Sequence, residues 1–149
     1  MANKEGEYYM SALKEFLVEN SDIVGKEVEV PISPRFKDKE GNLLRFKIRP
    51  MTGDEFGKYQ KQCTTINVNG RKKETIFDSG KFNLLCIINH CIDPDFKDAD
   101  FLKQLGVQTP EQAVSKTLLA GEIVELGNQV TKVSGFDTDI NEEIESAKN

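Results

Sequence analysis

The side chains best able to do chemistry in this sequence are its single histidine and its three cysteines. Cys86 and His90 are four residues apart and Cys91 follows directly, so together with Cys63 they offer ligand types that zinc prefers. Structural zinc sites usually combine two closely spaced ligand pairs, and the sequence does not supply two. We therefore predict that these residues lie in or near an apolar core as free thiols and a neutral imidazole, with no metal and no other cofactor.

Other patterns that could bind an ion or catalyse a reaction are incomplete. Asp137, Asp139 and Asn141 have the spacing of the first three calcium ligands of an EF-hand, but Glu142 replaces the required glycine and Lys148 the bidentate glutamate. The sequence also lacks the G-x-S-x-G, G-x-x-x-x-G-K-[ST] and G-x-G-x-x-G motifs of common enzyme classes. We predict a protein that binds another protein and is not an enzyme.

The charge of the chain is unevenly distributed. The net charge is −5, yet residues 35–73 hold 11 Lys and Arg against 4 Asp and Glu, a net +7. Phe36 and Phe46 interleave with cations that could contact phosphates: Arg35, Lys37, Lys39, Arg45, Lys47 and Arg49. Strand alternation would place Phe46 on the opposite face from those cations, and Lys and Arg also guard exposed strand edges against aggregation. We favour the guard role and keep a nucleic-acid-binding module using residues 35–73 as the alternative.

The first half of the chain predicts a helix and a hairpin. Apolar residues at helical spacing predict a helix from Tyr8 to Glu19. Alternation over residues 27–32 and 44–49 predicts two antiparallel strands, the first at a sheet edge because Pro31 lacks a backbone donor. Thr52 and Glu55 form a capping box that begins the next helix.

The second half is predicted to be mostly helical. A further hairpin turns at Asn69-Gly70, and the apolar segment 82–91 predicts a central buried helix capped by Asp78. Residues 99–105 form a short helix stopped by Gly106. A last helix begins at Thr109, has a kink at Gly121 and ends near Ser134.

A narrow apolar stripe on this last helix is the candidate protein-binding site. Its members are spaced 4, 3, 4 and 3 residues apart, a pattern suited to packing against another helix. We name it the 119–133 stripe: Leu119, Ile123, Leu126, Val130 and Val133. Residues Tyr9 to Leu17 carry a similar stripe. Each stripe could bind a partner or a second copy, and ordinary packing in the chain's own core is the alternative that we favour for either one.

The elements together predict an α+β fold, with a small antiparallel hairpin sheet packed with a mostly helical C-terminal half. We expect an N-terminal helix in residues 1–22, a single domain over 23–136, and an acidic, disordered tail over 137–149. The longest nearly apolar run, Phe82 to Ile92, is shorter than the about 20 residues of a membrane span, and no secretory leader is apparent. We expect a protein without a membrane partner in a reducing compartment.

A series of short segments runs in order through nearly the whole chain: Glu15–Leu17, Ser33–Asn42, Phe46–Thr52, Cys63, Phe77-Asp78, Lys81-Phe82, Cys91–Phe96, Leu118–Ile123 and Ser134–Phe136. This ordered series resembles the XkdN-like tail assembly chaperones of phages and prophages. The resemblance implies a protein of the bacterial host's cytoplasm that associates with the long tape measure protein, and with other tail proteins, while the tail is assembled. It brings no catalytic residues.

Overall fold

A computed structural model describes residues 11–22 and 26–136, and it confirms the α+β fold. The predicted tail at 137–149, its calcium-like spacing and helix residues 8–10 lie outside the described residues. Helix α1 (Ala12–Glu19) confirms the end of the first predicted helix at Glu19. Ser11 caps α1, because its Oγ accepts a hydrogen bond from the amide of Lys14 at 3.2 Å.

The main sheet has three antiparallel strands in the order β1-β2-β5. Their bounds are β1 Val28–Val30, β2 Phe46–Ile48 and β5 Cys91–Asp93. Strands β1 and β2 form the predicted pair, with β1 at the edge as Pro31 indicated, and Val30 lies opposite Phe46. Strand β5 was not predicted. It follows a helix without any break in the apolar run, and only its pairing with β2 gives it extended structure.

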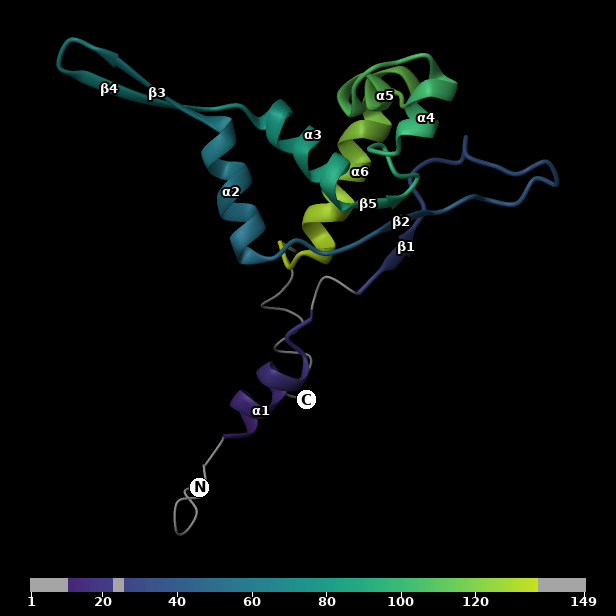
Figure 1. The fold of residues 1–149 in the computed structure, drawn as a ribbon, viewed down its shortest axis with the longest axis horizontal. Helices are drawn as coiled ribbons and strands as arrows, with labels where there is room; N and C mark the ends of the chain where they lie inside the picture. The colour runs from purple at the N-terminus through teal and green to yellow at the C-terminus, as the bar shows by residue number, and fades with distance from the viewer. Residues whose placement is uncertain (1–10, 23–25, 137–149) are drawn as a thin grey trace.

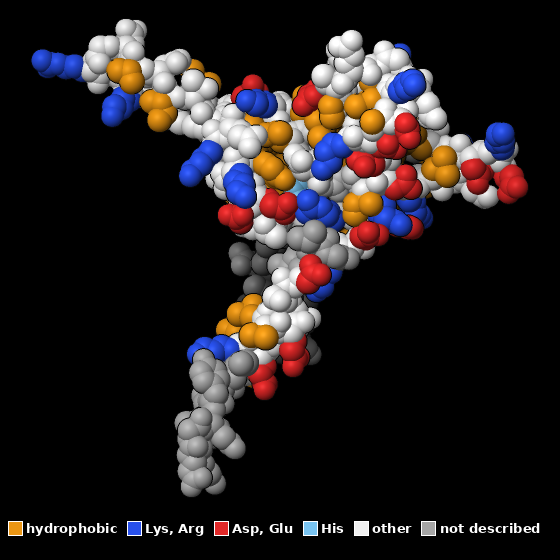
Figure 2. All heavy atoms as spheres, viewed as in Figure 1, with side chains coloured by type: hydrophobic (Ala, Val, Ile, Leu, Met, Phe, Trp, Pro, Cys, Tyr) orange, Lys and Arg blue, Asp and Glu red, His pale blue; other side chains and the backbone are white. Residues whose placement is uncertain are grey.

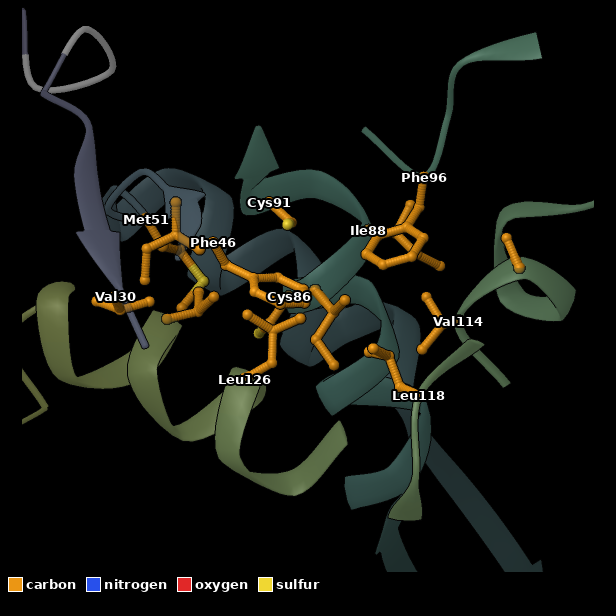
Figure 3. Packing of buried hydrophobic residues seen from close by; sticks show 14 of the residues in the cluster. Val30, Phe46, Met51, Cys86, Ile88, Cys91, Phe96, Val114, Leu118 and Leu126 are labelled. Atoms are coloured by element: carbon orange, nitrogen blue, oxygen red, sulfur yellow. The ribbon is translucent and has the colours of Figure 1, made fainter. Parts of the chain in front are cut away.

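Helix α3 (Ser79–His90) lies at the centre of the fold. As predicted, Asp78 caps it, accepting a hydrogen bond from the Lys81 amide at 3.0 Å. Around α3 pack the main sheet, α2 (Gly53–Cys63), α5 (Pro110–Thr117) and α6 (Ala120–Val133), as Figure 1 shows. Figure 3 shows the resulting core, in which Cys86 and Leu126 from the helices meet Phe46 from β2. The predicted capping box of α2 is present, and Thr109 and Gln112 form another at the start of α5.

The crossing of α3 and α6 depends on a small residue. Gly127 of α6 faces the side chain of Asn83 on α3, and a Cβ at position 127 would overlap that amide. The Asn83 Nδ2 donates a hydrogen bond to the Ile123 carbonyl oxygen at 3.2 Å. Gly127 thus lets the two helices approach closely enough for a side chain of one to bond to the backbone of the other.

The predicted kink at Gly121 is wrong: the helix breaks earlier. Helix α4 (Ala99–Leu105) ends at Gly106, as predicted, and α5 ends at Thr117. Leu118 and Leu119 are then extended, and α6 starts at Ala120. The side chain of Glu122 accepts a hydrogen bond from the Leu119 amide at 2.8 Å, which gives the second helix its own start signal.

The second predicted hairpin projects from the body as a two-stranded ribbon (Figure 1). It consists of β3 (Thr64–Asn69) and β4 (Lys72–Phe77), and Gly70 adopts a positive φ of 66° in the turn. At its root the Phe77 ring lies 5.5 Å from the Phe82 ring of α3. All residues of the ribbon beyond the half-buried Thr64 are exposed.

Candidate protein-binding surfaces

The structure places most of the 119–133 stripe inside the chain's own core. Leu126 and Val130 are fully buried, and Ile123 and Val133 are half-buried against the core. Only Leu119, 61% exposed, is open to a partner. The stripe is therefore not a free surface as a whole, because α3 occupies the position that a partner helix would take.

The single histidine belongs to a buried polar cluster between α2 and α3. His90 Nε2 lies 2.9 Å from the Tyr59 hydroxyl oxygen and 4.0 Å from Glu55 Oε2, and Arg49 pairs with the same carboxylate at 3.1 Å. Burial, and then the Arg49 charge, lower the pKa of His90 to about 4, so the imidazole is neutral. Burial would raise the pKa of Glu55, but Arg49 and the Thr52 amide hold it at about 2. His90 is fully buried in this cluster, so its imidazole is not accessible from solvent.

The three cysteines are free and buried. Burial raises the pKa of Cys86 and of Cys91 to about 12, which keeps both thiols protonated and unreactive. Within residues 11–22 and 26–136, no three His, Cys, Asp or Glu side chains are placed to hold a metal ion.

A cavity of about 330 Å³ with a mainly apolar lining opens beside β2, and we name it the apolar groove. Three separate segments line it: Phe36 to Phe46, Asp93 to Phe101, and Thr117-Leu118. Its apolar residues are Phe36, Leu44, Phe46, Pro94, Phe96, Phe101 and Leu118, and its polar ones are Arg45, Asp93 and Thr117.

Sequence reasoning missed the apolar groove, although two of its aromatic residues, Phe36 and Phe96, lie outside the predicted helices and strands. Phe36 packs edge-on against Phe46 with ring centres 5.0 Å apart, and Phe96 lies 6.1 Å from Phe101. Alternation along the predicted strand 44–49 puts Leu44 on the same face as Phe46, inside the hairpin, but Leu44 is 48% exposed at the groove. It precedes β2 rather than belonging to it, so strand alternation does not apply to it.

An ion pair fixes one wall of the apolar groove. Arg35 Nη2 and Nε donate to the two carboxylate oxygens of Glu122 at 2.6 and 2.9 Å, and Nη2 also donates to the Thr117 carbonyl oxygen at 2.9 Å. The Arg35 guanidinium holds the pKa of Glu122 at about 2, against the effect of burial. The loop that carries Phe36 is thereby joined to the start of α6.

Several of the Lys and Arg side chains in residues 35–73 form ion pairs within the fold. Arg35, Lys47 and Arg49 pair with Glu122, Glu27 and Glu55 at 2.6, 3.6 and 3.1 Å, respectively. A cation already neutralised by a carboxylate contributes little to phosphate binding. This observation weakens the nucleic-acid alternative.

Two further apolar surfaces project into solvent (Figure 2). One is on α1, none of whose residues is buried, and the other is on the ribbon. None of the described helices is long and apolar enough to cross a membrane.

Known proteins match this chain over most of its length. The family model described as phage XkdN-like tail assembly chaperone protein matches residues 13–148. The phage-like element PBSX protein XkdN of Bacillus subtilis strain 168 is 32% identical over 136 residues, which cover 90% of this chain and 92% of that protein. YqbN of the same organism is also 32% identical over 136 residues, covering 90% and 91%. The crystal structure of YqbN matches the fold with a TM-score of 0.65 at 27% identity, over 88% of this chain and all of that one.

Proposed function

Because the chain belongs to the phage XkdN-like tail assembly chaperone family, we propose that it binds the tape measure protein during tail assembly in the cytoplasm of the bacterial host. It acts by binding alone and catalyses no reaction. The tape measure protein is long and helical, so it exposes apolar stripes until tube subunits surround it. A chaperone for such a client covers these stripes reversibly.

The observation that carries this proposal is the apolar groove beside an exposed leucine. A groove of about 330 Å³ accommodates large apolar side chains from one face of an amphipathic helix. Leu44 is 48% exposed at the groove, where a client helix would cover it. Arg45 and Asp93 add charges of both signs with which polar client residues can pair.

The groove is prepared for binding before a client arrives. Its wall at Phe36 is fixed by the Arg35–Glu122 pair, and the Phe46 ring on its other side is 5% exposed in the core. A site that is already ordered loses less conformational entropy when it binds. The junction of α5 and α6 supplies the remaining wall through Leu118.

Co-expression with the tape measure protein tests the proposal. We expect the native chain to keep the tape measure protein soluble and to co-purify with it, and Leu44→Arg to reduce the co-purified amount about tenfold by placing a charge in the groove. Leu43→Arg is the matched control, since Leu43 is 41% exposed next in the chain and does not line the groove.

Equal insolubility of the tape measure protein with and without this chain would contradict the function. Equal loss of binding in Leu43→Arg and Leu44→Arg would contradict the groove as the site.

A further inference from the structure

Helix α1 carries an apolar stripe that nothing in the described chain covers. Leu13, Phe16 and Leu17 are 67%, 58% and 58% exposed, and their spacing puts them on one face of the helix. We name these three residues the α1 stripe. An isolated helix of this length is marginal in water, so α1 gains stability when another surface covers the stripe.

The ribbon also has one apolar face. Side chains alternate along each strand, and Ile66 is paired with Thr75 and Val68 with Lys73. We name the resulting set the ribbon's apolar face: Thr64, Ile66, Val68, Lys73, Thr75 and Phe77. The opposite face holds Ile76 among more polar residues. A two-stranded ribbon is marginally stable alone and needs a packing partner on its apolar side.

The two surfaces have complementary charge. Residues 58–81, which contain the ribbon, hold six Lys and Arg against two Asp and Glu. On α1, Glu19 borders the α1 stripe beside Phe16, whereas Glu15 lies on the opposite face of the helix. Lys73 lies on the ribbon's apolar face itself and Arg71 in the adjoining turn, so an acidic residue such as Glu19 at the border of the stripe is favoured there.

We propose that α1 of one copy packs its stripe on the ribbon's apolar face of a second copy. In Figure 1, α1 and the ribbon project from different sides of the body, so neither covers the other within one copy. The ribbon is long enough to hold the helix: six strand residues span about 20 Å and an eight-residue helix about 12 Å. The contact is heterologous, because it joins different surfaces of the two copies.

Sedimentation velocity of the full chain without any client tests this contact. We expect self-association that rises with concentration, and an about tenfold weaker affinity for Phe16→Asp and for Ile66→Asp. The matched controls are Val18→Asp, at an exposed α1 residue off the stripe, and Ile76→Asp, on the opposite ribbon face. Combining Glu19→Lys with Lys73→Glu should restore affinity that either change alone reduces.

Mixed-copy crosslinking identifies the occupant of the ribbon. One copy carries Leu17→Cys and a second, larger tagged copy carries Val68→Cys, while the native cysteines are buried. We expect a disulfide between the two copies, and much less with the off-face pair Val18→Cys and Asn67→Cys. A native chain that stays monomeric at every concentration overturns the proposal, and so do Phe16→Asp and Ile66→Asp variants that associate as strongly as the native chain. A third chain carries both Leu17→Cys and Val68→Cys. If this chain forms a disulfide within itself and the two singly substituted copies form none with each other, the proposal is also overturned.

Because no tape measure protein is present, these results are independent of the proposed client binding. Loss of co-purification in Leu44→Arg with normal self-association would separate the two surfaces. Loss of self-association in Phe16→Asp with normal co-purification of the tape measure protein would separate them as well.

Discussion

Helices α1 and α6 have the same kind of amphipathic sequence and lie in opposite environments. In α6, Leu126 and Val130 are fully buried against α3, whereas in α1 Phe16 and Leu17 are each 58% exposed. Both stripes repeat at helical spacing. This pattern predicts an apolar face that packs against another surface, but it does not identify that surface. The difference comes from neighbours distant in sequence, which pack around α6 but, among residues 11–22 and 26–136, not around α1.

The two sheets repeat this contrast. Strand β2 lies between two others and buries Phe46 and Ile48, while the ribbon has no third strand and leaves Ile66 and Val68 63% and 64% exposed. The body thus contains the buried core of the fold, whereas the projecting elements leave apolar side chains exposed. Three measurements test this division.

The largest effect is expected in the body. Leu126→Ala removes a fully buried side chain from the core and should lower the free energy of unfolding by about 3 kcal/mol. Urea unfolding followed by circular dichroism measures the change. A decrease in the free energy of unfolding of less than about 1 kcal/mol would mean that the packing of α6 on α3 contributes much less stability than the burial of Leu126 indicates.

A pH-dependent loss of stability is expected from His90. Its pKa is about 4 when folded and 6.5 in the unfolded chain, so the unfolded state binds the proton first as the pH falls. The free energy of unfolding should therefore decrease from about pH 6.5 to about pH 4, by about 1.4 kcal/mol per unit and about 3 kcal/mol in all. Glu55 and Glu122, with pKa values of about 2, lose their contributions in a lower window, below 4.5.

Urea titrations of the native chain and of His90→Gln at several pH values isolate this contribution. The variant should be less pH-dependent between about pH 6.5 and about pH 4, whatever its stability at neutral pH. An equal slope in both chains would show that His90 is already protonated in the folded state.

The smallest effect is expected on α1. Leu17→Ala removes as large a side chain as Leu126→Ala, yet it should change the free energy of unfolding by less than about 0.5 kcal/mol in dilute solution. The matched pair of leucine truncations measures directly how the body differs from the projecting helix. A cost comparable to that of Leu126→Ala would place α1 in the core.

Local signals in the sequence were sufficient to predict most of the helices and the turn of the ribbon. The caps at Thr52, Asp78 and Thr109 begin their helices as predicted, because capping hydrogen bonds join residues close in sequence. The turn at Asn69-Gly70 was predicted for the same reason. Strand β5 and the early break at Leu118 were missed, since they depend on pairing with β2 and on burial of Leu118.

The candidate site was less predictable than the fold. The apolar groove combines Phe36 and Leu44 with Phe96 and Phe101, more than 50 residues further along the chain. The Arg35–Glu122 pair spans 87 residues. No periodicity relates such positions, so only the tertiary structure identifies the groove.

The close approach of Gly127 to Asn83 makes the two positions interdependent in evolution. Any larger residue at 127 displaces the amide that bonds to the Ile123 carbonyl, so it requires the side chain at 83 to move or to be smaller. Sequences that carry a larger residue at 127 should therefore also carry a different residue at 83, whereas a change at 83 alone leaves room for Gly127.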